Sequence, residues 1–173
     1  DLYDWNLNVL DRDIDTAIQR LGEANERCKA GELDITDSAA LDKALSEAHL
    51  VISMVPAHMH LNVAKACIKH NAHLVTASYL TPEMRALDDE ARSNGLVFLN
   101  ECGLDPGIDH MSAARLLDGI RNDGGEIVLF ESFTGGLLSP DSEGNNPWRY
   151  KFTWNPRNVV LAGQGGAVKF IQE

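Results

Sequence analysis

The sequence predicts an α/β protein in which a doubly wound parallel sheet is followed by the start of a second α/β domain. Two observations support this fold class. Short apolar runs of strand length alternate with stretches of helical periodicity, at a repeat of roughly 20 to 25 residues. In addition, the run from Leu50 to Val55 is apolar almost throughout, which is typical of a central parallel strand covered on both faces.

The predicted strands and helices alternate up to residue 99. Apolar or β-branched runs of strand length lie at residues 5–10, 32–35, 50–55, 73–77 and 96–99. Stretches with apolar side chains three or four residues apart lie between them, at residues 14–21, 39–45, 61–68 and 82–91. Capping residues from Thr36 to Ser38, a proline at Pro82 and a glycine at Gly95 mark helix ends. Because each strand is followed by a helix, the strands are expected to be parallel.

A turn dense in glycine and proline follows the fifth predicted strand, from Gly103 to Met111. Such a turn is tight and rigid, and functional groups on it are expected to face a crevice. Beyond it, a helix is predicted over residues 111–120 and a strand over residues 126–133. Residues 135–173 are rich in loop-forming and aromatic residues, and no helix or strand can be assigned to them. We therefore expect a second domain to begin here without being completed.

The composition argues against several classes of protein. A formal net charge of −11, from 26 acidic and 15 basic residues, argues against a nucleic-acid-binding surface. No apolar run approaches the roughly 18 residues that a membrane helix requires. The three cysteines are odd in number and lack metal-ligand spacing, which favours a reduced, cytoplasmic compartment. We therefore expect neither a nucleic acid nor a membrane as partner.

Candidate cofactor-binding residues follow the predicted strands, because open α/β sheets bind ligands at the carboxyl ends of their strands. Asp11 can bind the ribose 2′-hydroxyl of NAD, whereas Arg12 can meet the 2′-phosphate of NADP; a solvated turn is the alternative. The other candidates follow the second and third strands, and they are Asp34, Ile35, Ser53, Val55 and Pro56. No G-x-G-x-x-G precedes Trp5, so the sequence is expected to start at the second strand of a nucleotide-binding sheet.

Other reactive side chains have weaker patterns. His58 and His60 lie two residues apart without nearby cysteine or carboxylate ligands, so no metal site is predicted. Cys102 is expected to be buried, and Asp109 with His110 to brace the helix that follows them. Residues 146–157 alternate cationic and aromatic side chains, which suits a carboxylate-bearing small molecule or, alternatively, an edge strand. The candidate anion-binding residues there are Arg149, Lys151 and Arg157.

Five segments together resemble the saccharopine dehydrogenase family, and its glutamate-forming members in particular. They are L-V-I-S-M-V-P at residues 50–56, V-T-A-S-Y at 75–79, N-E-C-G-L-D-P-G-I-D-H-M at 100–111, G-G-L at 135–137 and N-P-W-R-Y-K-F-T-W at 146–154. The resemblance implies a Rossmann dinucleotide-binding domain at residues 1–104, without its first strand and Gly-rich loop. It also implies the beginning of a substrate-binding and dimerisation domain at residues 105–173, and a homodimer.

The resemblance also implies an activity and a site. The reaction would be reversible oxidation, by NAD or NADP, of the C–N bond of saccharopine or a similar imine-derived amino acid. Tyr79 and Asp105 match acid/base positions, and the positions implied to bind substrate are Ser78, Gly103, Thr134 and Arg157. Thr134 departs from the cysteine found in many relatives, which puts a thiol acid/base role in doubt. The alternatives are a catalytically silent Rossmann-fold binding or regulatory module, and a relative that reduces another imine, such as a carboxyspermidine-type or homospermidine-type intermediate.

Overall fold

The structure is a computed structural model of the chain. It describes residues 4–22, 26–133, 136–142, 144–151, 156–157 and 160. The chain divides into two compact units, Asp1–Glu126 and Ile127–Glu173. The first unit contains all the strands that the structure describes as ladders, whereas the second contains a short 3₁₀ turn and one bridge between Leu137 and Tyr150.

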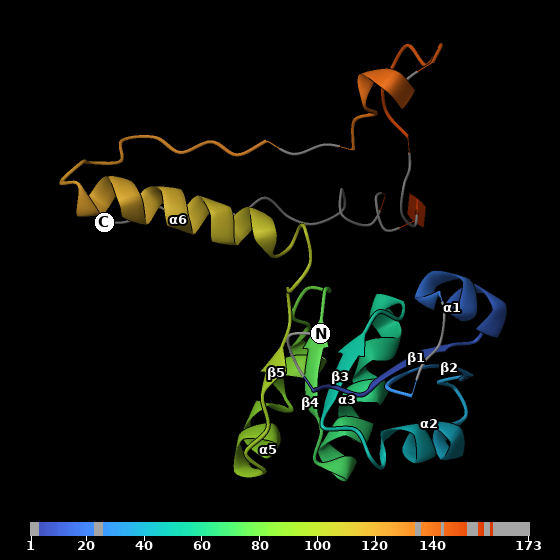
Figure 1. The fold of residues 1–173 in the computed structure, drawn as a ribbon. Helices are drawn as coiled ribbons and strands as arrows, with labels where there is room; N and C mark the ends of the chain where they lie inside the picture. Colours follow the sequence, from blue (N-terminus) through green and yellow to red (C-terminus); the bar gives the residue numbers. More distant parts are fainter. Residues whose placement is uncertain are drawn as a thin grey trace. The chain divides into compact units, whose positions relative to one another are not determined.

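The strands of the first unit form two parallel sheets (Figure 1). The first sheet pairs β1 (Leu7–Asp11) with β2 (Cys28–Glu32), and Leu7 lies opposite Cys28. The second has the order β3-β4-β5 and consists of β3 (Leu50–Ser53), β4 (His73–Thr76) and β5 (Phe98–Leu99). All three pairings are parallel, as the alternation of strands and helices predicts.

Helices connect these strands, and three of the helices begin at residues whose side chains cap them. They are α1 (Ile14–Leu21), α2 (Ser38–Leu45), the 3₁₀ turn η1 (Ala57–Met59), α3 (His60–His70), α4 (Pro82–Arg85), α5 (Asp88–Ser93), α6 (Ile108–Asn122) and the 3₁₀ turn η2 (Pro140–Ser142). The side chains of Asp13, Asp37 and Thr81 accept hydrogen bonds from the first-turn N–H groups of α1, α2 and α4. No helix in the described part of the chain is long and apolar enough to cross a membrane.

The core of the first unit lies between α2, α3 and the second sheet. Its buried members are Leu41, Leu45, Val63, Ala64, Ala66, Cys67, Ala72, Leu74 and Met84. Leu74, at the centre of β4, is only 1% exposed. Burial raises the pKa of the Cys67 thiol to about 12, so this cysteine is an uncharged packing residue at neutral pH.

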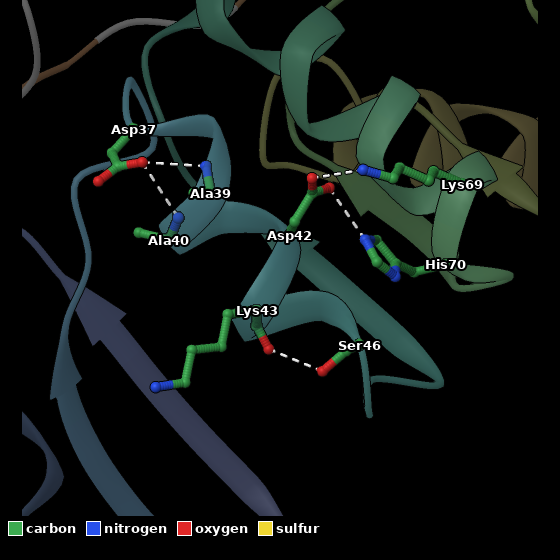
Figure 2. A network of polar contacts seen from close by, with 8 residues as sticks. All are labelled: Asp37, Ala39, Ala40, Asp42, Lys43, Ser46, Lys69 and His70. Carbon is green, nitrogen blue, oxygen red and sulfur yellow. Dashed lines mark hydrogen bonds and ion pairs between the residues drawn. The ribbon is translucent and has the colours of Figure 1, made fainter.

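A carboxylate joins α2 to α3 at the edge of this core (Figure 2). Oδ1 of Asp42 lies 2.9 Å from Nε2 of His70, and Oδ2 accepts a hydrogen bond from the Lys69 ammonium group. Hydrogen bonds from Lys69 and then from His70 hold the pKa of Asp42 below its ordinary value. Both partners come from the last turn of α3, so Asp42 ties the two helices together.

We expect the Asp42→Asn variant to be less stable than the wild type at neutral pH. A carboxyl group whose pKa is lowered by folding contributes stability above its unfolded pKa, and this contribution is lost as pH falls through the lowered pKa. Urea unfolding between pH 2 and 7 should therefore show a midpoint difference that disappears in acid. Asp88→Asn is the control, because Asp88 pairs with Arg92 inside one short helix. A pH-independent difference for Asp42→Asn would contradict the assignment.

Several sequence-based boundaries were wrong. The second strand lies at residues 28–32 rather than 32–35, because the apolar Leu33 and Ile35 pack on the core from a turn that Asp34 stabilises. Residues 126–133 are not a strand: Val128 and Phe133 are both 89% exposed, and no described segment pairs with them. The helix predicted over residues 82–91 is divided at Ala86 and Leu87 into α4 and α5.

The apolar strand expected at residues 50–55 is present as β3 (Leu50–Ser53) and is parallel, as expected, but among the described strands it is not central. It forms an edge of the three-stranded sheet as described, and β4 is the central strand. Leu50 and Ile52 are 51% and 63% exposed, so β3 is not covered on both faces by the described residues. β1 and β3 each have one edge without a partner strand among the described residues. Both strands also carry exposed apolar side chains.

Candidate functional site

A cavity of about 340 Å³ is lined by residues from the segments that follow the carboxyl ends of β3, β4 and β5. Its lining includes His60 from α3, Tyr79 and Thr81 from the segment after β4, Glu83 from α4, and Asn100 from the segment after β5. Parallel strands direct their carboxyl ends to the same edge of a sheet, and ligands of open α/β sheets bind at this edge. The cavity is therefore the candidate active site of the first unit.

Tyr79 and Asp105, which are separated by 26 residues in sequence, form a hydrogen bond at this edge. The phenolic hydroxyl of Tyr79 donates to Oδ1 of Asp105 across 3.2 Å. Partial burial and the negative charge of Asp105 raise the pKa of Tyr79 above its ordinary value of 10.0. The raised pKa keeps the phenol protonated at neutral pH, so it is a hydrogen-bond donor, and the carboxylate beside it is an acceptor.

The Gly-Pro turn holds Asp105 in place through its own backbone. The N–H of Gly103 donates to the carbonyl of Pro106 at 2.9 Å, and the N–H of Ile108 donates to the carbonyl of Gly103 at 2.9 Å. The Asp105–Pro106 peptide bond is cis. The N–H of Cys102 donates to the carbonyl of Thr76, which joins the turn to the end of β4. The expectation that Cys102 is buried was wrong. Cys102 lies in the turn after β5, and its side chain is exposed.

Asp109 and His110 brace the start of α6, as the sequence predicts. Oδ1 of Asp109 accepts a hydrogen bond from the N–H of Gly107 at 2.8 Å and lies 2.9 Å from Nδ1 of His110. In addition, the carboxylate of Glu101 accepts a hydrogen bond from the N–H of Leu80 at 3.1 Å. These contacts stabilise the turn that carries Asp105 and connect it to the segment that carries Tyr79.

Sequence analysis missed the role of His60, whose imidazole joins two predicted site residues. Nδ1 of His60 lies 2.8 Å from Oγ of Ser53, and Nε2 lies 2.8 Å from Oγ of Ser78 and 3.0 Å from Oγ1 of Thr76. His60 is only 4% exposed. The sequence did offer one sign of this role, because His60 begins the helix that follows the third strand. The two-residue spacing between His58 and His60 argued only against a metal site. No described group of His, Cys, Asp or Glu is arranged to hold a metal ion.

We expect the neutral form of His60 to stabilise the fold. Burial lowers the pKa of His60 from its ordinary value of 6.5, so the folded state binds fewer protons than the unfolded state just below that pH. The contribution is complete above pH 6.5 and is lost as pH falls toward the lowered pKa. Urea unfolding of the wild type should show this loss, and the His60→Gln variant should show less of it. Equal slopes for both proteins below pH 6.5 would contradict the prediction.

The candidate cofactor residues at β1 and β2 lie in two adjacent turns. Oδ1 of Asp11 accepts a hydrogen bond from the N–H of Asp13 at 2.8 Å. The side chain of Asp34 accepts from both the N–H and the hydroxyl of Thr36, at 2.9 and 2.7 Å. These bonds, and after them the nearby charge of Arg12, lower the pKa of Asp34. The guanidinium group of Arg12 and the two carboxylates therefore occupy one exposed edge.

The remaining predicted site residues differ in what the structure says of them. Ile35 and Val55 are partly buried and pack on the core, while Pro56 precedes η1 and is exposed. Gly103 is close to β4, since a side chain there would lie 3.1 Å from Cβ of Ala77. Arg157 is exposed in the second unit, and Thr134 lies outside the described residues.

Parallel strands joined by helices, with polar side chains gathered at their carboxyl ends, define a Rossmann-type α/β domain. Residues 2–99 match the family model for the saccharopine dehydrogenase NADP binding domain, and residues 103–173 match that for the saccharopine dehydrogenase C-terminal domain. The chain therefore belongs to the saccharopine dehydrogenase family, and the resemblance seen in its motifs is confirmed.

Individual relatives agree with this assignment. The chain is 45% identical over 144 residues to the NADP(+)-dependent, L-glutamate-forming saccharopine dehydrogenase of Schizosaccharomyces pombe, covering 83% of this chain and 32% of the relative. It is 45% identical to the alpha-aminoadipic semialdehyde synthase of Arabidopsis thaliana, covering 80% of this chain and 13% of the relative. The solved structure of the apo, L-Glu-forming saccharopine dehydrogenase of Saccharomyces cerevisiae matches with a TM-score of 0.77 and 40% sequence identity. The match covers 92% of this chain and 35% of the yeast chain. The chain thus spans about a third of the length of the fungal relatives that it matches.

Proposed function

We propose that this chain provides the nucleotide-binding domain and part of the substrate site of an NADP-dependent saccharopine dehydrogenase. The reaction is saccharopine plus NADP⁺ and water giving glutamate, aminoadipate semialdehyde, NADPH and a proton, and it is reversible. The observation that carries the proposal is the hydrogen-bonded pair of Tyr79 and Asp105 beside the cavity, in a chain of this family. A reaction at a secondary amine requires a proton donor and a proton acceptor in one place, and this pair contains both.

In this proposal the nicotinamide supplies hydride transfer, and the protein supplies binding, orientation and proton transfer. The raised pKa keeps the phenol of Tyr79 protonated, and the O–H that donates to Asp105 in the structure would turn to donate a hydrogen bond to the substrate nitrogen or to the attacking water. The Asp105 carboxylate accepts the proton that water loses when it adds to the imine carbon. Gly103 allows the substrate close to the backbone, and Ser78, Thr134 and Arg157 bind substrate carboxylates.

The residues at the ends of β1 and β2 suit NADP. The similar saccharopine dehydrogenases of Schizosaccharomyces pombe and Saccharomyces cerevisiae carry NADP(+) in their names. In this chain, Arg12 is an exposed cation beside Asp11. A guanidinium group binds a phosphate through paired hydrogen bonds, so Arg12 would hold the 2′-phosphate. Asp11 would bind the adjoining ribose, Asp34 and Ile35 the adenine side, and Ser53, Val55 and Pro56 the dinucleotide along β3.

The strand order supports one further part of the proposal. A Rossmann sheet has the order 3-2-1-4-5-6, and the two observed sheets correspond in direction and sequence to strands 3-2 and strands 4-5-6. Strand 1 of that order lies between strands 2 and 4, which here are β1 and β3. We propose that a strand carrying the Gly-rich phosphate turn pairs with both, which would join the two sheets and make β3 an inner strand.

A cytoplasmic location and a homodimer are also part of this proposal. The sequence has three cysteines, an odd number without metal-ligand spacing, and this favours a reducing compartment. Sedimentation of the full-length protein would test the dimer, and a single species with the mass of one chain would contradict it.

The direct test follows nicotinamide absorbance in the full-length protein with saccharopine and either NADP⁺ or NAD⁺. We expect turnover with saccharopine and a preference for NADP⁺ that Arg12→Ala reduces. Cofactor binding without turnover would support a silent binding module instead, and turnover only with another imine-derived amine would support the alternative relative. Absence of both binding and turnover would overturn the proposed function.

A further inference from the structure

The imidazole of His60 contacts hydroxyl groups from two strands. Ser53 is the last residue of β3, Thr76 is the last residue of β4, and Ser78 lies two residues further on. Ser53 and Thr76 are 4% and 1% exposed, whereas Ser78 is only partly buried. The hydrogen bonds that the structure describes for His60 therefore connect two buried hydroxyls to a partly exposed one, next in sequence to Tyr79, which lines the cavity together with His60.

The arrangement of oxygens favours one tautomer of His60. A neutral imidazole has one N–H donor and one lone pair. Nε2 lies near two oxygens, those of Ser78 and Thr76, while Nδ1 lies near one. One N–H can be shared between two acceptors, but one lone pair accepts a single proton well. The proton of His60 is therefore placed on Nε2, and the hydroxyl of Ser53 donates to Nδ1.

The contacts of Thr76 agree with this placement. Its hydroxyl oxygen accepts a hydrogen bond from the N–H of Ser78 at 3.2 Å and retains a second lone pair, which can accept from Nε2 of His60. Ser53 uses its proton to hold Nδ1. With the proton of His60 on Nε2, Ser78 accepts from the imidazole and its own proton remains available for donation.

We propose that His60 is a positioning residue that holds the Ser78 hydroxyl as a hydrogen-bond donor toward a carboxylate oxygen of the amino-acid substrate. This rests on the proposed function, because it assumes that the substrate occupies the cavity beside β4. Ser53 fixes the tautomer from the far side of the ring and does not contact substrate. A serine hydroxyl that accepts from His60 still has its proton to donate, and a carboxylate oxygen of an amino-acid substrate is an acceptor that suits it.

The test compares four forms of the full-length enzyme: wild type, His60→Leu, Ser78→Ala and the double variant. We expect each single variant to raise KM for saccharopine about tenfold, as loss of a hydrogen bond to a charged group predicts, with little change in affinity for NADP⁺. The double variant should be no worse than Ser78→Ala, because His60 acts only through Ser78. His60→Gln, whose amide can donate near the position of Nε2, should restore most of the affinity. Additive losses, or no rescue by glutamine, would overturn the proposal.

A measurement on the wild type keeps the proposal falsifiable if His60→Leu does not fold. Nitrogen-15 NMR of histidine-labelled protein, assigned by comparison with His60→Gln, should show the proton of His60 on Nε2. A proton on Nδ1 would overturn the proposal, whatever the enzyme does. Failure of the proposed function has a different signature, namely a wild type without turnover on saccharopine; a wild type that turns over while the variants match it removes only the role of His60.

Discussion

Replacing Gly107 by alanine should destabilise this protein more than the same replacement at Gly95 or Gly119. Gly107 has φ +144° and ψ −89°, a conformation that residues with a side chain rarely adopt. A Cβ atom there would lie 2.2 Å from the carbonyl oxygen of Gly103, 2.6 Å from its nitrogen and 2.8 Å from the carbonyl oxygen of Glu101. All three contacts are with backbone, so the turn has to open.

The expected loss combines two costs. A residue forced into a sparsely populated backbone conformation costs about 1–3 kcal/mol, and overpacking costs about 1–3 kcal/mol more. Together they approach the free energy of unfolding of a small domain, about 5–15 kcal/mol. The hydrogen bonds between Gly103 and Pro106 and between Gly103 and Ile108 would be lost as well, since they close the same turn. Urea unfolding followed by circular dichroism measures the effect.

Alanine substitutions at Gly95 and Gly119 distinguish the cost of backbone strain from the cost of overpacking. Gly95 has φ +69° with no atom within 4 Å of the added Cβ, so Gly95→Ala should cost only the backbone strain, about 1 kcal/mol or slightly more. Gly119 lies inside α6 with open space around it, and Gly119→Ala should stabilise the helix by about 0.5–1 kcal/mol. If Gly107→Ala were no worse than Gly95→Ala, the close backbone packing of the turn would be disproved.

The sequence predicts elements well where local chemistry decides the structure. Asp37 caps α2 and Pro82 begins α4 because their side chains satisfy, or remove, N–H groups of the first turn. Prediction failed where tertiary pairing decides. Residues 28–32, C-K-A-G-E, have little strand character and become β2 only because β1 lies beside them. Residues 126–133 have strand character and form no strand, because the described part of the chain offers them no partner.

The candidate site shows the same division. The motif resemblance singled out Tyr79 and Asp105, and their carboxyl-end positions follow from the order of strands. Their hydrogen bond could not be predicted, since it depends on how the turn after β5 folds back toward the end of β4. His60 was missed because spacing along a sequence shows a metal site, whereas three hydroxyls converging on one imidazole from separate segments appear only in three dimensions.

Removing the charge of Asp105 should produce the largest functional loss. In the full-length enzyme, Asp105→Asn keeps the shape of the side chain but cannot accept a proton, so kcat should fall about 10²-fold or more. Tyr79→Phe removes the donor and should lower kcat by a similar order. Affinity for NADP⁺ should change little in either variant, because neither side chain lies among the candidate cofactor residues. Steady-state kinetics and calorimetry distinguish these effects.

The pair should act as a unit, and this makes the prediction sharper. If the phenol and the carboxylate share one proton-transfer task, the double variant should be little slower than the slower single variant, because the losses of coupled groups do not add. Asp118→Asn is the matched control, since Asp118 is an exposed carboxylate on α6 that pairs with Arg121 at 3.4 Å. Multiplicative losses in the double variant would show that the two residues act separately.

A titration tests the same pair without turnover. Partial burial and then the charge of Asp105 raise the pKa of Tyr79, so Asp105→Asn should lower that pKa toward 10 without restoring it fully, because the burial remains. The absorbance of tyrosinate reports the change, and the signal of Tyr79 is obtained by subtracting the titration of Tyr79→Phe. An unchanged pKa would mean that Asp105 does not face the phenol in solution. In that case the turn from Gly103 to His110 would position some other group for the chemistry, and the proton-transfer role proposed for Asp105 would have to be abandoned.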